Sequence, residues 1–144
     1  MSTPATHTPQ EVLKFMLEHD RFTAWLGIEV TAIAAGSCTL HFTVREEMLN
    51  GLGTLHGGVT YAAADSALAF ASNSHGRLSV ALNCAMDYMV AGKAGDVLTC
   101  TAVEESLQNK VAVYVIRVTN QRDEVMALFK GTVYRTGKPV VREV

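Results

Sequence analysis

The sequence carries little net charge, contains few prolines and has no long hydrophobic run. Lys and Arg total 12 against 14 Asp and Glu, and the formal net charge of −2 offers no basic field for nucleic acid. No apolar stretch is long enough to span a bilayer, and residues 1–10 lack the charged-then-apolar order of a signal peptide. We therefore expect a cytoplasmic protein that binds neither nucleic acid nor membranes. A length of 144 residues predicts one domain over 1–144, with loose tails at 1–8 and 138–144.

The sequence also lacks paired cysteines and clustered metal ligands. Cys38, Cys84 and Cys100 are widely spaced, and each lies in a strand-like run. We expect small buried thiols; a nucleophilic role would need a histidine or a helix terminus nearby, which nothing in the pattern indicates. No group of Cys, His and Asp has ligand spacing, so we expect neither a metal nor a cofactor.

Hydrophobic periodicity indicates one long helix among many strands. Thr8-Pro9 resembles a helix start, with helix expected to about Asp20 and an apolar continuation to Gly27. A period of two then predicts a hairpin over 28–44 and, after a turn at 73–76, strands over 78–90, 97–103, 111–118 and 125–134. The connections are short. This order predicts an α+β domain, an antiparallel sheet wrapped around one long central helix, with a short helix at the N-terminus.

The segment from Asn50 to Asn73 carries the candidate chemistry. An alanine-rich, proline-free stretch follows Gly57 and Gly58 and predicts a buried helix that begins near Gly57. The first N–H groups of a helix lack intrahelical partners and carry partial positive charge. We expect Gly57 and Gly58, which have no side chain in the way, to offer amides to a carbonyl or anionic oxygen.

Asp65 is the charged residue of this helix, and its neighbours one turn away are almost all apolar. A buried carboxylate is costly unless it is hydrogen-bonded or used, and burial raises its pKa toward the range of a general base. A structural aspartate bonded to a loop amide or to Ser66 is the alternative. Gly57 lies eight residues earlier, about 12 Å along the helix, too far for one ester carbonyl to touch both in one chain. We therefore predict a two-fold dimer in which two chains build each site.

Several motifs together resemble the hotdog-fold acyl-CoA thioesterases, most closely the phenylacetic-acid-degradation type called PaaI. The matching segments extend over nearly the whole chain: Met48-Leu49-Asn50-Gly51, His56-Gly57-Gly58, Ala64-Asp65, Asn73-Ser74 with Gly76, Gly95-Asp96, and Ala127-Leu128-Phe129 with Gly131. The resemblance implies a hotdog fold, a homodimer or homotetramer, and an active site at the dimer interface. It also implies hydrolysis of small, aromatic acyl-CoAs of the phenylacetyl or hydroxyphenylacetyl type, with CoA as part of the substrate.

In similar enzymes the residues matching Gly57 and Asn50 polarise the thioester carbonyl, and the partner's carboxylate matching Asp65 acts as nucleophile or as base on water. His56 resembles a supporting residue that fixes the loop and Asn50, with a direct bond to substrate as the alternative. Some relatives hold the water with a serine or threonine, but Ala69 and Ala81 or Asn83 stand near those positions here. Ser79 and Asn83 are the remaining candidates for that role.

We count Gly58, Tyr61 and Asn83 as substrate-binding residues. The pocket itself could be aromatic or aliphatic, with candidate lining residues Tyr61, Phe70, Met86, Tyr88 and Met89. Two alternative functions follow, a medium-chain acyl-CoA thioesterase and a non-catalytic acyl-ligand-binding hotdog oligomer. The histidine that hydratases of this fold carry five residues after the aspartate is missing here, so a hydratase is disfavoured.

Overall fold

The structure, a computed structural model, describes residues 7–143 and contains one six-stranded sheet with a long helix against it. The helices are α1 (Pro9–Leu17), α2 (Arg21–Leu26) and α3 (Gly57–Asn73), with a short 3₁₀ turn at Glu46–Met48. The strands are β1 (Glu29–Ala34), β2 (Ser37–Thr43), β3 (Arg77–Tyr88), β4 (Val97–Leu107), β5 (Val111–Thr119) and β6 (Val125–Pro139). No helix in the described part of the chain is both long and apolar enough to cross a membrane.

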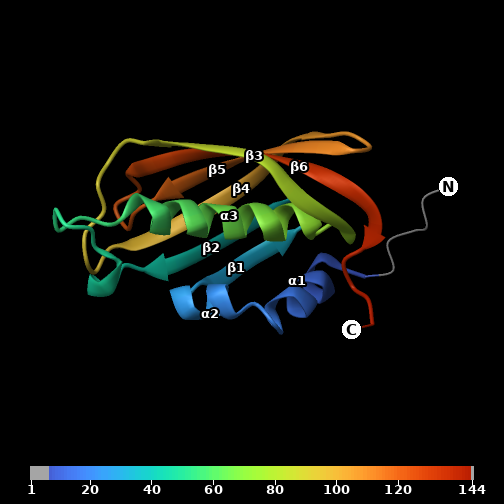
Figure 1. The fold of residues 1–144 in the computed structure, drawn as a ribbon, viewed down its shortest axis with the longest axis horizontal. Helices are drawn as coiled ribbons and strands as arrows, with labels where there is room; N and C mark the ends of the chain where they lie inside the picture. Colours follow the sequence, from blue (N-terminus) through green and yellow to red (C-terminus); the bar gives the residue numbers. More distant parts are fainter. Residues whose placement is uncertain (1–6, 144) are drawn as a thin grey trace.

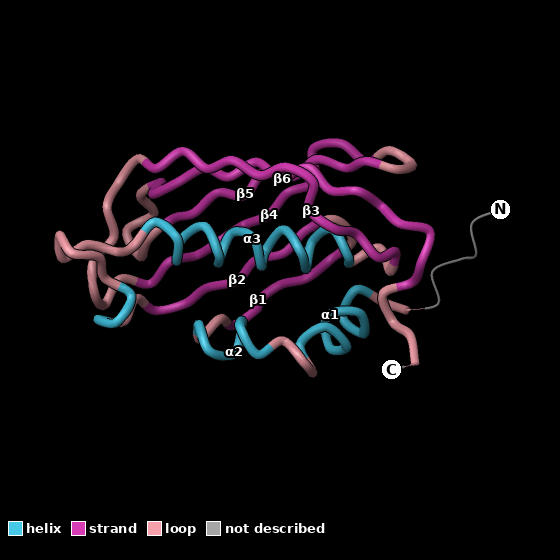
Figure 2. The backbone as a smooth tube through the Cα atoms, viewed as in Figure 1, coloured by secondary structure: helices cyan, strands magenta, loops and turns pink. Residues whose placement is uncertain are grey.

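The sheet has the order β1-β2-β4-β5-β6-β3, and every pair of neighbours is antiparallel. It curls around α3, with β1 and β2 on one side of the helix and β3 and β6 on the other (Figure 1). The smooth trace in Figure 2 shows α1 and α2 beside β1, away from the β3 edge. The predicted α+β hotdog fold is therefore confirmed.

Small residues let α3 lie close to the sheet. Ala63, Ala64, Ala67 and Ala71 have no exposed surface, and an alanine-rich helix combines strong helix propensity with a thin profile. A methyl group at Gly131 of β6 would come within 2.5 Å of the Leu68 side chain. Glycine at this position of β6 therefore lets Leu68 rest directly on the strand.

The N-terminal helical segment is divided in two. Thr8 caps α1 through the Glu11 N–H at 3.2 Å, as expected from Thr8-Pro9. The helix ends at Leu17 rather than near Asp20, because the Asp20 side chain accepts from the Thr23 N–H at 2.9 Å and caps α2. Gly27 ends α2 with a φ of 79°, at the residue to which the apolar segment was expected to continue.

Strand β3 does not follow the simple alternation that its sequence suggests. Ala81 pairs with Val133 and Asn83 with Thr132, so Leu82 is an extra residue in a β-bulge. The bulge reverses which residues face the helix: Ser79 is buried before it, and the partly buried Cys84 and Met86 follow it. Val80 and Leu82 are left 47% and 60% exposed on the outermost strand.

The C-terminal segment is ordered further than predicted. We expected the last strand to end near Tyr134 and a loose tail from 138, but β6 continues through Pro139. Val140 follows it, is only 3% exposed and donates its N–H to the Gly76 oxygen at 3.0 Å. An apolar side chain in the tail thus closes the end of the sheet near Gly76. Of the expected N-terminal tail, residues 1–6 lie outside the described part of the chain.

Candidate active site

The loop before α3 is shaped by the Asn50 side chain. Its Oδ1 accepts from the N–H groups of Leu52 and Thr54 at 2.9 and 3.2 Å, and its Nδ2 donates to Thr54 Oγ1 at 3.0 Å. These bonds close a compact turn over residues 50–54. The amide nitrogen has two N–H groups, so one remains to polarise a ligand oxygen, the role implied by the family resemblance.

His56 caps α3. Its Nδ1 accepts from the Gly58 N–H at 2.9 Å, and its backbone N–H donates to the Met48 oxygen. The neutral ring therefore carries its proton on Nε2, which stays free to donate. We expected both glycine amides to face a ligand, but the cap engages the N–H of Gly58. Within residues 7–143, the Gly57 N–H has no hydrogen-bond partner and is the open donor at this helix end.

Asp65 lies two turns further along α3, on the side that the sheet leaves open. Its side chain reaches solvent in the single chain, yet the protein around it removes enough water to raise the carboxyl pKa. No hydrogen bond from a described residue holds the carboxylate. The alternative of a structural aspartate bonded to Ser66 or to a loop amide therefore finds no contact in the structure.

Tyr61 and Cys84 stand beside Asp65. Tyr61 is one turn before it on α3, with its ring edge-on to Phe129 at 5.1 Å, and Cys84 faces the helix from β3. Burial, followed by the Asp65 charge, raises the pKa of the Cys84 thiol. Burial also raises the pKa of the Tyr61 hydroxyl, with smaller contributions from Cys84 and Asp65. Asn83 precedes Cys84, so its side chain points to the opposite face of β3, away from Asp65 of the same chain.

The three thiols are poor nucleophiles. Cys38 and Cys100 are buried as predicted, and burial raises the pKa of each to about 12. The pKa of Cys84, the partly exposed thiol, is raised as well, so the reactive thiolate is scarce at neutral pH. Among the described residues, no group of three His, Cys, Asp or Glu side chains could hold a metal ion.

A cavity of about 340 Å³ opens beside Gly57, between the start of α3 and the chain that follows β3. Tyr88 and Met89 are the predicted lining residues that it contains, whereas Phe70 belongs to the core. Thr60 of α3 also lines the cavity, and the other walls come from loops and strands that sequence patterns did not connect to the site: Leu55, Val90, Ala91, Gly92, Leu98 and Met126. None of the lining side chains carries a charge, so the cavity suits an uncharged, largely apolar group.

Comparison with known proteins assigns the chain to a family. The sequence model of the thioesterase superfamily matches residues 52–127, which include Gly57 and Asp65. The acyl-coenzyme A thioesterase PaaI of Escherichia coli is 38% identical over 128 residues, covering 89% of this chain and 91% of the relative. The chain belongs to the thioesterase superfamily. The predicted PaaI-type resemblance and the prediction of a thioester hydrolase are thereby confirmed.

Solved structures agree with this assignment. The E. coli PaaI structure aligns with this thioesterase at a TM-score of 0.90 and 36% identity, covering 94% of this chain and 98% of that one. A PaaI structure from Thermus thermophilus aligns at a TM-score of 0.79 and 42% identity, covering 81% of this chain and 100% of that one. A hypothetical thioesterase from Streptococcus pneumoniae, solved with coenzyme A, aligns at a TM-score of 0.75 and 26% identity. The alignment covers 78% of this chain and 90% of that one.

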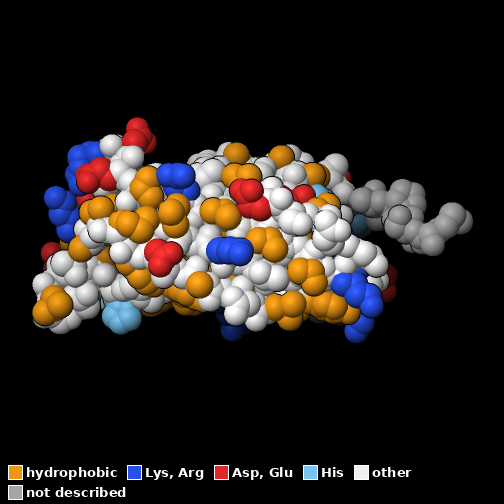
Figure 3. All heavy atoms as spheres, turned by 90° about the horizontal axis from the view of Figure 1, so that it is seen from above, with side chains coloured by type: hydrophobic (Ala, Val, Ile, Leu, Met, Phe, Trp, Pro, Cys, Tyr) orange, Lys and Arg blue, Asp and Glu red, His pale blue; other side chains and the backbone are white. Residues whose placement is uncertain are grey.

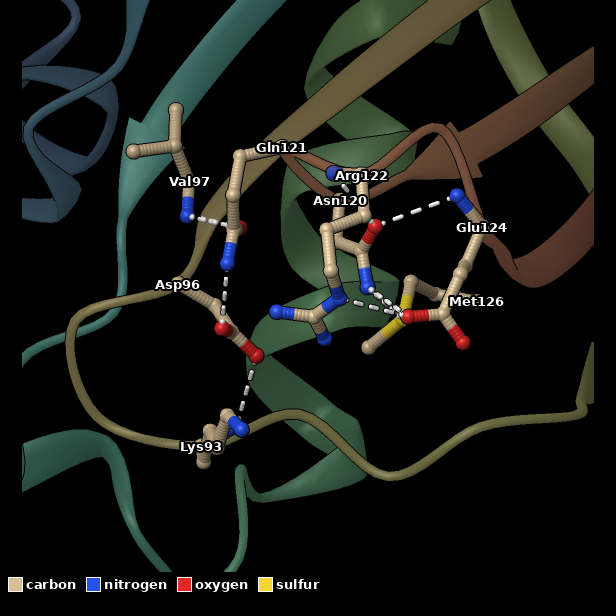
Figure 4. Close-up of polar contacts among 8 residues, drawn as sticks. All are labelled: Lys93, Asp96, Val97, Asn120, Gln121, Arg122, Glu124 and Met126. Atoms are coloured by element: carbon tan, nitrogen blue, oxygen red, sulfur yellow. Dashed lines mark hydrogen bonds and ion pairs between the residues drawn. The ribbon is translucent and has the colours of Figure 1, made fainter.

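A polar network fixes one side of the thioesterase cavity (Figure 4). The buried Asp96 accepts from the Lys93 N–H at 3.0 Å and from Gln121 Nε2 at 2.9 Å, and Gln121 Oε1 accepts from the Val97 N–H. Nearby, Asn120 Oδ1 accepts from the N–H groups of Arg122 and Glu124. The network ties the loop with Gly92 to the turn that leads into Met126, so it connects two segments that contribute to the cavity wall.

Proposed function

We propose that this thioesterase hydrolyses acyl-CoA thioesters to a free acid and CoA. The observation that carries the proposal is the unpaired Gly57 N–H at the start of α3, next to a cavity without charged side chains. Two relatives support the proposal: E. coli PaaI is named an acyl-coenzyme A thioesterase, and the S. pneumoniae thioesterase structure was solved with coenzyme A. We infer the same substrate class for this chain.

In the proposed reaction, the Gly57 N–H and the free N–H of the Asn50 amide donate to the thioester carbonyl oxygen. Negative charge develops on that oxygen as the carbonyl is attacked, and fixed donors stabilise it more in the transition state than in the substrate. Asp65 either takes a proton from the attacking water or attacks the carbon itself, forming an anhydride that water then opens. The C–S bond breaks and CoA leaves as a thiolate, which needs little help from an acid.

Each site is proposed to use Gly57 of one chain and Asp65 of a second copy. The two residues are eight positions apart on one straight helix, about 12 Å along its axis. The outer edge of β3 is unpaired within the described residues, and Val80 and Leu82 are exposed on that strand. A second copy added antiparallel along β3 extends the sheet and covers these side chains.

The surface near β3 fits this arrangement. Figure 3 views the molecule from above, the side where Figure 1 places β3 and β6, and shows hydrophobic side chains spread across this face, with individual acidic and basic side chains between them. Tyr88, Met89 and Val90, 54%, 48% and 40% exposed, continue the apolar surface toward the cavity. A homodimer is therefore the proposed active unit, and the homotetramer suggested by the resemblance remains a prediction.

The cavity is the proposed site of the acyl group. Its apolar walls and the Tyr88 ring suit a small aromatic acyl group such as phenylacetyl or hydroxyphenylacetyl, and Met89 and Met126 can adapt to a medium-length chain instead. Tyr61 is proposed to form the side of the substrate site near Asp65. Gly58 is proposed to support the substrate indirectly, as part of the capped first turn of α3. Asn83 points away from the site of its own chain, so any contact with substrate would be to the site of the partner.

A thiol-release assay with a panel of acyl-CoAs tests the proposal. We expect turnover by the wild type, loss of turnover in Asp65→Asn and Asp65→Ala, and highest kcat/KM for phenylacetyl-type esters. Binding of acyl-CoA without thiol release would instead indicate the non-catalytic acyl-binding oligomer. Unchanged turnover in both Asp65 variants would contradict the proposed role of this carboxylate, whatever the preferred ester.

A further inference from the structure

Tyr88 is hydrogen-bonded to Gly57, the residue that carries the open donor, through a contact that the proposed reaction does not use. It is the last residue of β3, and its hydroxyl donates to the Gly57 carbonyl oxygen at 2.9 Å, across a sequence separation of 31 residues. This bond ties the end of the edge strand to the first residue of α3. It therefore connects the wall of the cavity to the proposed oxyanion site.

The Tyr88 ring also packs against Gly57. A methyl group placed on Gly57 would lie 3.2 Å from Tyr88 Cε1 and 3.3 Å from Cζ, closer than ordinary van der Waals contact. The ring thus occupies the space where a side chain at position 57 would go. Glycine at this position permits both the ring contact and the short hydroxyl bond.

Glycine alone does not fix the direction of its own N–H, because it has more accessible backbone conformations than any other residue. Here the peptide units on both sides of Gly57 are restrained: the His56 oxygen accepts from the Val59 N–H at 3.0 Å, and the Gly57–Gly58 unit is held by two bonds. The His56 cap holds the Gly58 N–H at 2.9 Å, and the Tyr88 hydroxyl holds the Gly57 oxygen of the same peptide unit. An oxyanion donor is effective only when it already points at the place where charge develops.

We propose that Tyr88 is a positioning residue that fixes the Gly57 amide for the developing oxyanion. The inference rests on the proposed thioester hydrolysis and adds a residue for which neither the motifs nor the resemblance gave a role beyond lining a pocket. Burial by the surrounding protein raises the pKa of the Tyr88 hydroxyl, so it stays protonated and able to donate over the working pH range. Its action is through Gly57, without contact with the reacting atoms.

Steady-state kinetics of Tyr88→Phe test the proposal, because this change keeps the ring and removes the hydroxyl. Loss of one hydrogen bond of about 1 kcal/mol predicts a kcat roughly fivefold lower. KM should change by less than about twofold, since the cavity wall is retained. The kcat loss should be the same for phenylacetyl-CoA and for a short aliphatic acyl-CoA, because the carbonyl is common to both.

Tyr134→Phe is the matched control. Tyr134 lies on β6, is 38% exposed, and its hydroxyl has no hydrogen bond with a described residue, so kcat and KM should stay at wild-type values. A second readout follows the Gly57 amide directly: its ¹⁵N–¹H resonance should shift in Tyr88→Phe, but not in Tyr134→Phe. This readout needs no turnover.

The outcomes distinguish a failure of the proposed thioester hydrolysis from a failure of the proposed role of Tyr88. A wild type without turnover contradicts the proposed function, whereas an active wild type with an equally active Tyr88→Phe overturns this inference alone. A defect confined to KM, or one that varies with the acyl group, assigns Tyr88 to the cavity wall only and also overturns it. An unchanged Gly57 resonance has the same meaning.

Discussion

Asp65 combines a position on the open side of α3 with a carboxyl whose pKa is raised by partial burial. For an acid, a higher pKa in the folded state than in the unfolded state means that the ionised form opposes folding at neutral pH. We predict that Asp65→Asn lowers kcat on the order of a thousandfold, while its melting temperature equals or exceeds that of the wild type. Thiol release and thermal unfolding measure the two effects.

Asp87→Asn is the control for this change. Asp87 is exposed on β3, four residues beyond Asn83 at the end of the bulge, and its neutralisation should leave turnover unchanged. An Asp65→Asn variant that unfolds at markedly lower temperature would favour a structural aspartate. An unchanged melting temperature together with a loss of turnover would agree with a catalytic role for the Asp65 carboxylate.

The pH dependence of kcat/KM follows from the same carboxyl. Asp65 acts in its ionised form, so activity rises as the pH passes through its pKa. The ordinary value for Asp is about 4, and partial burial raises it here, so the acidic limb should lie above pH 4. A profile measured from pH 4 to 9 checks this, and a limb that stays flat down to pH 4 would argue against Asp65 as the titrating group.

At the scale of elements, Glu104 of β4 fixes the far end of α3. His75 Nε2 lies 2.6 Å from Glu104 Oε2, and the Tyr114 hydroxyl donates to the same oxygen at 2.7 Å. Burial opposes ionisation of Glu104, but the hydrogen bonds from His75 and Tyr114 outweigh it and lower the pKa. The stabilisation is therefore present above the unfolded pKa of about 4.3 and is lost as the pH falls through the lower folded value.

Glu104→Gln should reduce the free energy of unfolding by about 1 kcal/mol at pH 7. The difference from the wild type should disappear in strongly acidic solution, where the wild-type carboxyl is also protonated. Urea denaturation at a series of pH values measures this, with the exposed neighbour Glu105→Gln as the control. A Glu104→Gln deficit that is equal at all pH values would mean that shape, rather than charge, explains the contribution.

Contact between α3 and β6 gives a second test at this scale. A methyl group at Gly131 would lie within 2.5 Å of Leu68, whereas one at Gly137 of the same strand would meet nothing within 4 Å. Gly131→Ala should therefore destabilise the domain by about 1–3 kcal/mol through overpacking, and Gly137→Ala should have little effect. Similar unfolding curves for the two variants would show that the helix can move away from the strand at low cost.

Local patterns predicted the elements well because they follow local physics. The alanine-rich run correctly predicted that α3 starts at Gly57. The alternation of residue types correctly predicted the buried side of β2, with Cys38, Leu40 and Phe42. The bulge at Leu82 escaped detection, because Leu78 to Val90 alternates without interruption in sequence. Only the pairing with β6 reveals the extra residue.

The candidate site was predictable in part for the same reason. Gly57, His56 and Asp65 are marked by their residue types within one helix. The hydrogen bond of Tyr88 to Gly57 and the Met126 and Gly92 walls of the cavity depend on contacts between distant segments. Nothing in the local sequence signals those contacts. His56 engaging the Gly58 N–H, which leaves Gly57 as the open donor, likewise required atomic positions.

At the scale of the whole molecule, the account rests on a second copy beside β3. Leu82→Asp places a charge on a side chain that is 60% exposed in the single chain and is buried by the proposed pairing. We expect this variant to remain folded, to elute as a monomer in size-exclusion chromatography with light scattering, and to lose turnover. Leu52→Asp, a change at a 90% exposed leucine in the loop before α3, should keep the dimer. A folded, monomeric and fully active Leu82→Asp would contradict a shared site.

Two variants that each disable one half of the proposed site provide the material for the most direct test. Asp65→Asn removes the carboxylate. Gly57→Pro removes the open N–H at the first helical position, where proline is well tolerated, and Gly57→Ala is its control because it makes the same close contact with Tyr88 but keeps the N–H. We expect Gly57→Pro to be inactive as a homodimer and Gly57→Ala to retain much more turnover.

The decisive measurement is thiol release by heterodimers of Asp65→Asn and Gly57→Pro, formed by mixing and exchange of the two inactive proteins. If each site takes its carboxylate and its amide from different chains, every heterodimer has one site with both defects and one intact site. An equal mixture should then recover about a quarter of wild-type activity. Heterodimers that form but stay inactive would contradict the shared site.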